Sequence, residues 1–170
     1  ANDAFKPVTR YFDRITRPEQ IIQSFPAAVQ TMLDPADCGP ACISLSQDIQ
    51  GQTFDYPEDF FKEKIHTIRR PRPDEFQIKE AAEKIKSSKN PIIISGGGVF
   101  YSDAMEELSK FAIKHNIPVT QTVMGYSTMK RDHSHYAGQI GGLGGKNTNS
   151  LAKQTDLAIA VGTKLGDFTT

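Results

Sequence analysis

The chain has 170 residues, 38% of them hydrophobic and 24% charged, which is enough for one ordinary core or a domain with a flanking piece. Its 20 Lys and Arg residues balance its 20 Asp and Glu residues, so electrostatics give no reason to expect a nucleic-acid partner. No apolar run approaches the roughly 20 residues that span a bilayer, and the first residues do not resemble a signal peptide. We therefore expect a cytoplasmic protein without a membrane or nucleic-acid partner.

The possible metal ligands are few and badly spaced. Cys38 and Cys42 could supply half of a metal site, but no second Cys or His pair stands at a matching spacing. We expect reduced, half-buried thiols instead. His133 and His135 lie two apart in a polar stretch without a carboxylate cluster, which favours a solvated loop over a metal site or an acid-base pair. The sequence predicts no metal site and no catalytic residue in this chain.

The first predicted elements are a helix and a strand. Helical spacing of apolar residues predicts one buried face, made of Ile21, Ile22, Phe25, Val29, Met32 and Leu33. Thr16 and Glu19 could cap this helix reciprocally, and Pro26 should kink or divide it. The short apolar run at 41–45 predicts a buried strand.

Residues 52–74 predict an interdomain linker. Aromatic residues are spread among charges, and the segment ends in the run Arg-Arg-Pro-Arg-Pro at 69–73, which proline holds extended. Arg69, Arg70 and Arg72 could form a phosphate or nucleic-acid patch. Because they are isolated in a neutral chain, salt bridges are the favoured interpretation.

The pattern changes to alternating strands and helices after the linker. Helices are predicted around 78–85, at 102–115 and at 146–154, and strands at 91–95, 117–122 and 156–162. Ser102 should cap the second of these helices. This order predicts a three-layer α/β/α, Rossmann-like parallel sheet, with the second and third strands flanking the first. Open sheets of this class usually have five or six strands, so we expect about half of the sheet here. The apolar third strand would then lie at an edge, which predicts a homo-oligomer.

Two glycine-rich segments leave alternatives open. The glycines at 96–98 follow a strand and precede a helix, where free amides could hold a phosphate. The favoured alternative is a tight turn that needs positive φ, because the spacing is not G-x-G-x-x-G and no acidic ribose-binding residue follows. The glycines at 141–145 could lie against a ligand or a neighbouring domain, or be simply flexible.

Several segments resemble one family. The segments are GPACISLSQDIQ at 39–50, NPIIISGGG at 90–98, IPV at 117–119, MG at 124–125 and DLAIAVG at 156–162. Together they resemble the thiamine-diphosphate-dependent enzymes of the acetolactate synthase type, over nearly the whole chain. The resemblance implies that 1–51 is the C-terminal part of the pyrimidine-binding domain, that 52–74 is the linker, and that 75–170 is the first half of the middle domain.

Finer features resemble one branch of that family. They are YFDRITRPEQ at 11–20, QDIQ at 47–50, IRRPRP at 68–73 and DFTT at 167–170, with Ser46 where that branch usually has a proline. The branch hydrolyses a C–C bond of a cyclic dione in myo-inositol degradation, so the resemblance implies a small-molecule dione substrate. It also implies thiamine diphosphate and Mg²⁺ in the full-length enzyme.

The resemblance places the cofactor motifs outside this chain. The activating glutamate would precede Ala1, and the Gly-Asp-Gly motif that holds Mg²⁺ and diphosphate would follow Thr170. We therefore expect an inactive fragment with no bound cofactor.

Two rival functions remain open. In an acetolactate synthase the middle domain holds FAD, which by resemblance would contact Thr122, Val123, Met124, Gly142, Leu143 and Gly144. The family's two arginines after the third strand are absent from Lys164-Leu165-Gly166-Asp167-Phe168, which argues against FAD. The other rival is a stand-alone nucleotide-binding module that uses its glycine loops.

Overall fold

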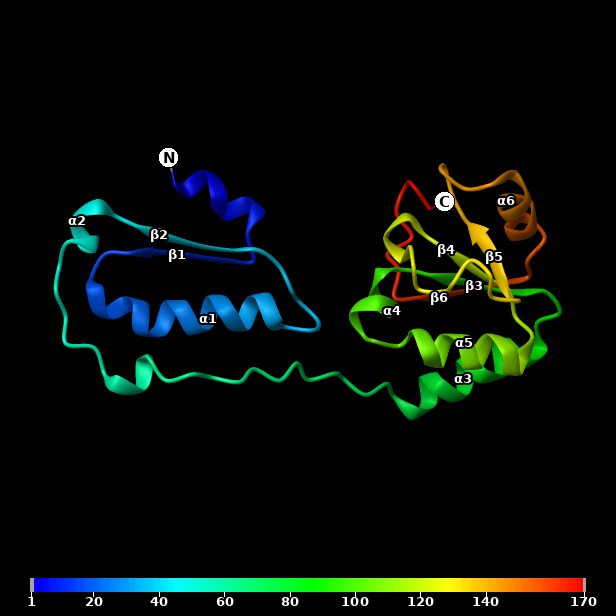
Figure 1. The fold of residues 1–170 in the computed structure, drawn as a ribbon, viewed down its shortest axis with the longest axis horizontal. Helices are drawn as coiled ribbons and strands as arrows, with labels where there is room; N and C mark the ends of the chain where they lie inside the picture. Colours follow the sequence, from blue (N-terminus) through cyan, green and yellow to red (C-terminus); the bar gives the residue numbers. More distant parts are fainter. Residues whose placement is uncertain (1, 170) are drawn as a thin grey trace. The chain divides into compact units, whose positions relative to one another are not determined.

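The computed structural model describes residues 2–169, and the chain divides into two compact units, Ala1–Pro73 and Asp74–Thr170. Each unit has its own parallel sheet (Figure 1). No helix in the described part of the chain is long and apolar enough to cross a membrane.

The first unit is a two-stranded parallel sheet with one long helix packed on it (Figure 1). Strand β1, Tyr11–Ile15, pairs with β2, Ala41–Leu45, and α1, Ile21–Leu33, contacts both strands. β1 is not among the predicted elements, whereas β2 and α1 are. The short elements are α2 at Gln47–Gln50 and 3₁₀ helices at Asn2–Val8, Pro18–Gln20 and Glu58–Phe60.

Helix α1 buries a different face from the one predicted. Its buried residues are Ser24 and Ala28, whereas Phe25 and Met32 are 52% and 46% exposed. A two-stranded sheet is narrow and covers only one line of the helix, and small side chains let the two backbones approach. The helix also runs unbroken through Pro26, so the predicted division is wrong.

Polar side chains fix α1 on β1. The Asp13 carboxylate accepts hydrogen bonds from the Ser24 hydroxyl and, at 3.0 Å, from the Gln20 amide, and these bonds lower the pKa of Asp13. Gln20 also accepts from the Thr16 backbone N–H at 3.0 Å. No side-chain capping bond is made at the start of the Pro18–Gln20 turn or of α1, so the predicted cap of Thr16 with Glu19 is wrong.

Residues 52–73 contain no strand and no helix other than Glu58–Phe60. The first part is held by ring contacts among Phe54, Tyr56, Phe60 and Phe61, with ring centroids 5.0 to 6.1 Å apart. Arg69 and Arg72 are exposed and form no ion pair among the described residues, so the salt bridges expected of these two arginines are absent there.

The second unit is a four-stranded parallel sheet in the order β5-β4-β3-β6. Strands β4 and β6 flank β3, as the sequence predicts. The strands are β3 Pro91–Ser95, β4 Val119–Gln121, β5 Tyr136–Gln139 and β6 Leu157–Val161; the helices are α3 Glu75–Ser87, α4 Gly97–Tyr101, α5 Met105–His115 and α6 Lys146–Lys153. Strand β5 escapes sequence analysis because it is short, has no β-branched residue and contains Gly138 at φ +97°.

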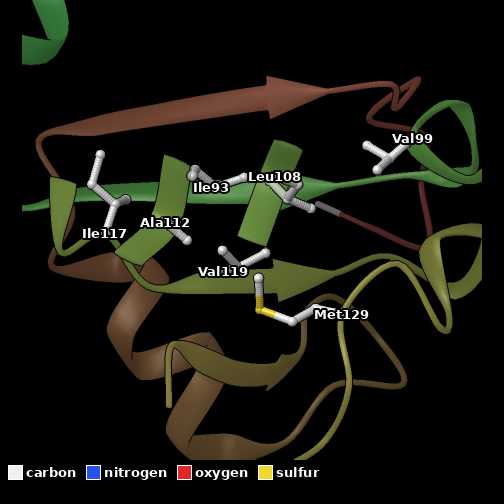
Figure 2. Packing of buried hydrophobic residues seen from close by; sticks show 7 residues of the cluster. All are labelled: Ile93, Val99, Leu108, Ala112, Ile117, Val119 and Met129. Carbon is white, nitrogen blue, oxygen red and sulfur yellow. The ribbon is translucent and has the colours of Figure 1, made fainter. Parts of the chain in front are cut away.

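Strand β3 forms the centre of three layers. Ile93 faces Leu108 and Ala112 of α5, in a cluster that includes Val99, Ile117, Val119 and Met129 (Figure 2). Ile92 and Ile94 point to the opposite face, where they pack with Ile140 and with Ala152 of α6. Burial on both faces explains the continuous apolar sequence of β3 and confirms the predicted three-layer α/β/α arrangement.

The segment between β3 and α5 differs from the prediction. A short helix, α4, already begins at Gly97, and Ser102 ends it instead of capping α5. Helix α5 begins at Met105 after Asp103, whose φ of 53° turns the chain. The helix predicted at 102–115 therefore begins later than expected, at Met105, and a separate short helix, α4, precedes it.

Asp156 connects the start of β6 to the turn before β3. Its carboxylate accepts hydrogen bonds from the Ser88 hydroxyl and from the backbone N–H groups of Lys89, at 2.7 Å, and Asn90, at 2.9 Å. These bonds, led by that of Ser88, lower the pKa of Asp156 from 3.8 to about 2.

We predict that Asp156→Asn lowers the melting temperature at pH 7. Because the pKa of Asp156 is about 2 in the folded state against an ordinary 3.8, the stabilisation by its carboxylate is full above the ordinary value. It is lost as the pH falls through about 2, so the difference between variant and wild type should shrink as the pH falls below 3.8. Thermal unfolding across this range measures it. Asp132→Asn removes the same charge where no carboxylate hydrogen bond is described, and a matching loss in that control would contradict the assignment.

Candidate functional site

The main cavity of the second unit lies at the carboxyl ends of its central strands. The chain adds β4 and β5 on one side of β3 and then crosses to β6 on the other side. Ligands of open α/β sheets bind where the strand order reverses in this way. A cavity of about 650 Å³ occupies this position, between the loops that follow β3, β4 and β6.

The cavity is mainly apolar. It is lined from α4, from the loop after β4, from Leu143 and from residues 162–169. Met124, Leu143 and Phe168 are 73%, 67% and 73% exposed, so large apolar side chains surround an open mouth. Lys164 and Asp167 are the charged residues among those that line it. Such a lining suits an uncharged or aromatic surface better than a phosphate chain.

The glycine turn after β3 does not offer free amides. The Gly96 N–H donates to the Val161 carbonyl at 2.9 Å, and the Gly98 N–H donates to the Gly162 carbonyl at 2.8 Å. Both donors are thus used to join the ends of β3 and β6. A phosphate held by this turn, the alternative interpretation, could therefore not bind two of the three glycine amides.

The glycines at 96–98 are required because neighbouring backbone lies too close to leave room for a side chain, not because their φ is positive. None of the three has a positive φ, which contradicts the favoured sequence interpretation. A Cβ on Gly97 would lie 2.9 Å from the Met124 carbonyl oxygen, and one on Gly98 would lie 2.7 Å from the Gly162 Cα. Gly162 itself has φ +58°, which favours glycine. The turn is therefore packed between two neighbouring loops.

Buried hydroxyl groups fix the loop after β4. The Ser95 hydroxyl donates to Thr128 Oγ1 at 2.7 Å, and the Thr128 hydroxyl donates to the Gly125 carbonyl at 2.8 Å. Thr122 Oγ1 accepts from the Gly125 N–H at 3.0 Å. These bonds hold the segment that carries Val123 and Met124 against the end of β3. Sequence analysis missed this network, although a serine that ends a buried strand was a usable signal.

The second glycine segment is tied to the chain after β6. Gly141 has φ +96°, and Asn149 both donates to its carbonyl and accepts from its N–H at 3.0 Å. The Gly142 N–H donates to the Phe168 carbonyl at 3.0 Å. The backbone approach expected here is thus an approach to residues 168–169 of the same unit.

The expected ligand-facing residues separate into two groups. Thr122, Val123, Met124 and Leu143 line the cavity, whereas Gly142 and Gly144 shape the adjoining loop without lining it. Sequence analysis did not select Tyr101 or residues 162–169, which supply much of the wall. Whether any of these residues contacts a ligand stays a prediction.

The histidines and cysteines are used in local contacts. His133 Nε2 pairs with the Ser109 hydroxyl at 2.9 Å, and its Nδ1 accepts from the His135 N–H at 3.1 Å. Cys38 and Cys42 are free thiols; Cys42 is half-buried as expected, but Cys38 is exposed. Within residues 2–169 no three His, Cys, Asp or Glu side chains lie close enough to hold a metal ion.

Comparisons with known proteins point to one family. Residues 78–170 match the family model for the thiamine pyrophosphate enzyme, central domain. Two curated relatives, from Clostridium perfringens (strain 13) and Bacillus subtilis (strain 168), are 48% and 47% identical over 99% of this chain. Both are 3D-(3,5/4)-trihydroxycyclohexane-1,2-dione hydrolases, and the chain covers 26% of each. The chain therefore spans about a quarter of the length of these relatives.

A solved structure has the same fold. The benzoylformate decarboxylase from Polynucleobacter necessarius matches with a TM-score of 0.79 over 97% of this chain and 30% of its own. Its sequence identity is 24%, so this likeness supports the fold alone.

We predict that Gly98→Ala destabilises the second unit by about 2–4 kcal/mol, because the new methyl group would overlap the backbone of Gly162. Gly142→Ala is the matched control, since a Cβ there meets nothing within 4 Å, and its effect should stay within about 1 kcal/mol. Urea unfolding of both variants measures the difference. Equal stabilities would mean that α4 can move away from β6.

Proposed function

Because the chain belongs to the thiamine pyrophosphate enzymes and matches their central domain, we propose that it is part of a hydrolase that opens the ring of 3D-(3,5/4)-trihydroxycyclohexane-1,2-dione. The observation that carries this proposal is the 44–48% identity to enzymes of that name along 99% of the chain. The reaction would cleave a C–C bond with consumption of water and give 5-deoxyglucuronate in myo-inositol degradation.

We extend the proposal to the domains. Residues 1–51 would be the C-terminal part of the pyrimidine-binding domain, 52–74 the linker, and 75–170 the first half of the central domain. The parallel β1–β2 pair with α1, and the irregular backbone that follows Gly51, support these boundaries. The proposed full-length enzyme is cytoplasmic and forms a homo-oligomer; light scattering over a range of concentrations tests the second point.

The described residues do not fit thiamine diphosphate with Mg²⁺. The cavity presents one carboxylate, Asp167, and the Gly96 and Gly98 amides are already bonded to β6. In the full-length enzyme the cofactor would supply the electron sink for C–C cleavage. We assign no residue of this chain to that chemistry and propose that other segments of a longer protein bind the cofactor and Mg²⁺.

The contribution of this chain would be to shape a central-domain cavity. We propose that the loops containing Thr122, Val123, Met124, Gly142, Leu143 and Gly144 face a ligand or a neighbouring part of the full-length enzyme. The apolar lining of the cavity supports this role, since four of the six residues contribute to it.

An acetolactate synthase-like carboligase is the alternative within the family. It would need FAD in the central domain, yet the segment at 164–168 provides one cation, Lys164, in place of two arginines. A stand-alone nucleotide-binding module is disfavoured because two of the three amides that would hold its phosphates donate to carbonyls at the end of β6 and directly after it.

We predict that this chain binds neither thiamine diphosphate nor FAD. Calorimetric titration with thiamine diphosphate and Mg²⁺, and separately with FAD, should show no saturable binding tighter than about 10 μM, or about −7 kcal/mol. Binding of thiamine diphosphate would reveal a site that the described residues do not suggest. Binding of FAD would favour the carboligase or the nucleotide-binding module.

The full-length protein should open the cyclic dione and leave pyruvate unchanged. With thiamine diphosphate and Mg²⁺ present, we expect 5-deoxyglucuronate as the product by mass spectrometry. Acetolactate formation from pyruvate, without dione hydrolysis, would contradict the proposed reaction and support the alternative.

A further inference from the structure

A second, smaller cavity lies beside the loop that follows β4. Its volume is about 190 Å³. It is lined by Gln121, Tyr126, Ser127, Met129, Lys130 and Arg131. None of these residues lines the main cavity. Since liquid water occupies roughly 30 Å³ per molecule, the volume suits a ligand about the size of six water molecules.

The pocket contains an unused hydrogen-bond acceptor. Gln121 is 2% exposed, and its Nε2 donates to the Met129 carbonyl at 2.8 Å, whereas no described hydrogen bond reaches its Oε1. Among residues 2–169, no side-chain oxygen that is fully buried lacks a partner. The Oε1 atom must therefore be open to the pocket that Gln121 lines. A ligand that fills the pocket needs a hydrogen-bond donor at this point.

Two exposed cations stand at the same pocket. Lys130 and Arg131 form no ion pair within residues 2–169, and the next residue, Asp132, is not among the lining residues. Arg131 donates to the Tyr126 hydroxyl oxygen at 3.0 Å, and its guanidinium lies 5.5 Å from the centre of that ring. This contact orients the guanidinium and uses one of its N–H donors, so the others remain for an anion.

Ser127 adds a hydroxyl group to the lining. Its φ is +73°, in the left-handed region, and its hydroxyl takes part in no described hydrogen bond. Glycine would adopt this backbone without strain, so the fold does not explain a serine here. Its hydroxyl group can serve as a further contact for a polar ligand.

We propose that this pocket binds a small anion that carries a hydroxyl group. Lys130 and Arg131 hold the negative charge, and Gln121 Oε1 accepts the hydrogen bond from the ligand hydroxyl. A short hydroxy acid and a protonated phosphate share this chemistry. Because the pocket has no lining residue in common with the main cavity, the proposal goes beyond the hydrolase activity and stands whether or not that activity is found.

Titration of the unmodified chain with three-carbon compounds tests the two requirements separately. D-glycerate has a carboxylate and hydroxyl groups, propionate has the carboxylate alone, and glycerol has hydroxyl groups alone. Calorimetry should show saturable binding of glycerate with a Kd of about 1 mM or below, binding of propionate at least about tenfold weaker, and none of glycerol.

Inorganic phosphate, titrated in the same way, distinguishes the two kinds of anion, and the tighter of phosphate and glycerate identifies the source. Failure of both to bind below about 10 mM would overturn the proposal. Equal affinity for glycerate and propionate would contradict the hydrogen bond to Gln121.

Exposed cation variants locate the binding. Lys130→Gln and Arg131→Gln should each weaken binding of the tighter anion at least about tenfold, because each removes a charge from the pocket. Lys114→Gln removes an exposed lysine near the end of α5, outside the pocket, and should change the affinity less than about twofold. Equal weakening in all three variants would mean attraction by the general surface charge and would overturn the pocket.

Ser127→Gly separates a ligand contact from a role in the fold. Glycine relieves the positive φ, so the melting temperature should stay the same or rise, whereas loss of the hydroxyl should weaken binding about threefold or more. A lower melting temperature with unchanged binding would exclude Ser127 from the site.

Discussion

The contact between the backbones of Gly98 and Gly162 is the constraint on which the second unit depends. Parallel pairing of β3 with β6 brings the two strand ends together, and the Gly96 and Gly98 amides continue that pairing beyond the strands. A side chain at either position would separate the turns. Because the cavity lies directly beside this contact, the glycines that close the sheet also determine the wall of the site.

This use of the glycines changes the functional meaning of the segment at 96–98. A glycine turn between a strand and a helix suggests anion binding when its amides point into open space. Here two amides donate to Val161, the last residue of β6, and to Gly162, which follows it, and the large exposed residues around the cavity are apolar. The same local sequence can thus serve sheet closure or phosphate binding, and only the partner strand, some 65 residues away, distinguishes them.

The pattern of apolar residues in the sequence predicted the element that is buried on both of its faces. Strand β3, flanked by β4 and β6, could be identified because its apolar run is long and uninterrupted. Strand β5 could not, since its four residues pair through their backbone and include a glycine at positive φ. The prediction of the buried face of α1 was wrong for a related reason. Ser24 and Ala28 are weak apolar signals, and their burial depends on Asp13 and on the narrow sheet.

The site shows the same limit. Thr122, Val123, Met124 and Leu143 line the cavity, and all four were selected through family resemblance, not through periodicity. Residues 163–169 have no periodicity, and their position depends on a bond between two backbone groups far apart in the sequence. A backbone bond of this kind leaves no mark on residue choice, because Gly142, which donates it, has neither a positive φ nor a close neighbour that would require glycine. The cavity wall formed by residues 163–169 is therefore the part of the site that sequence describes least.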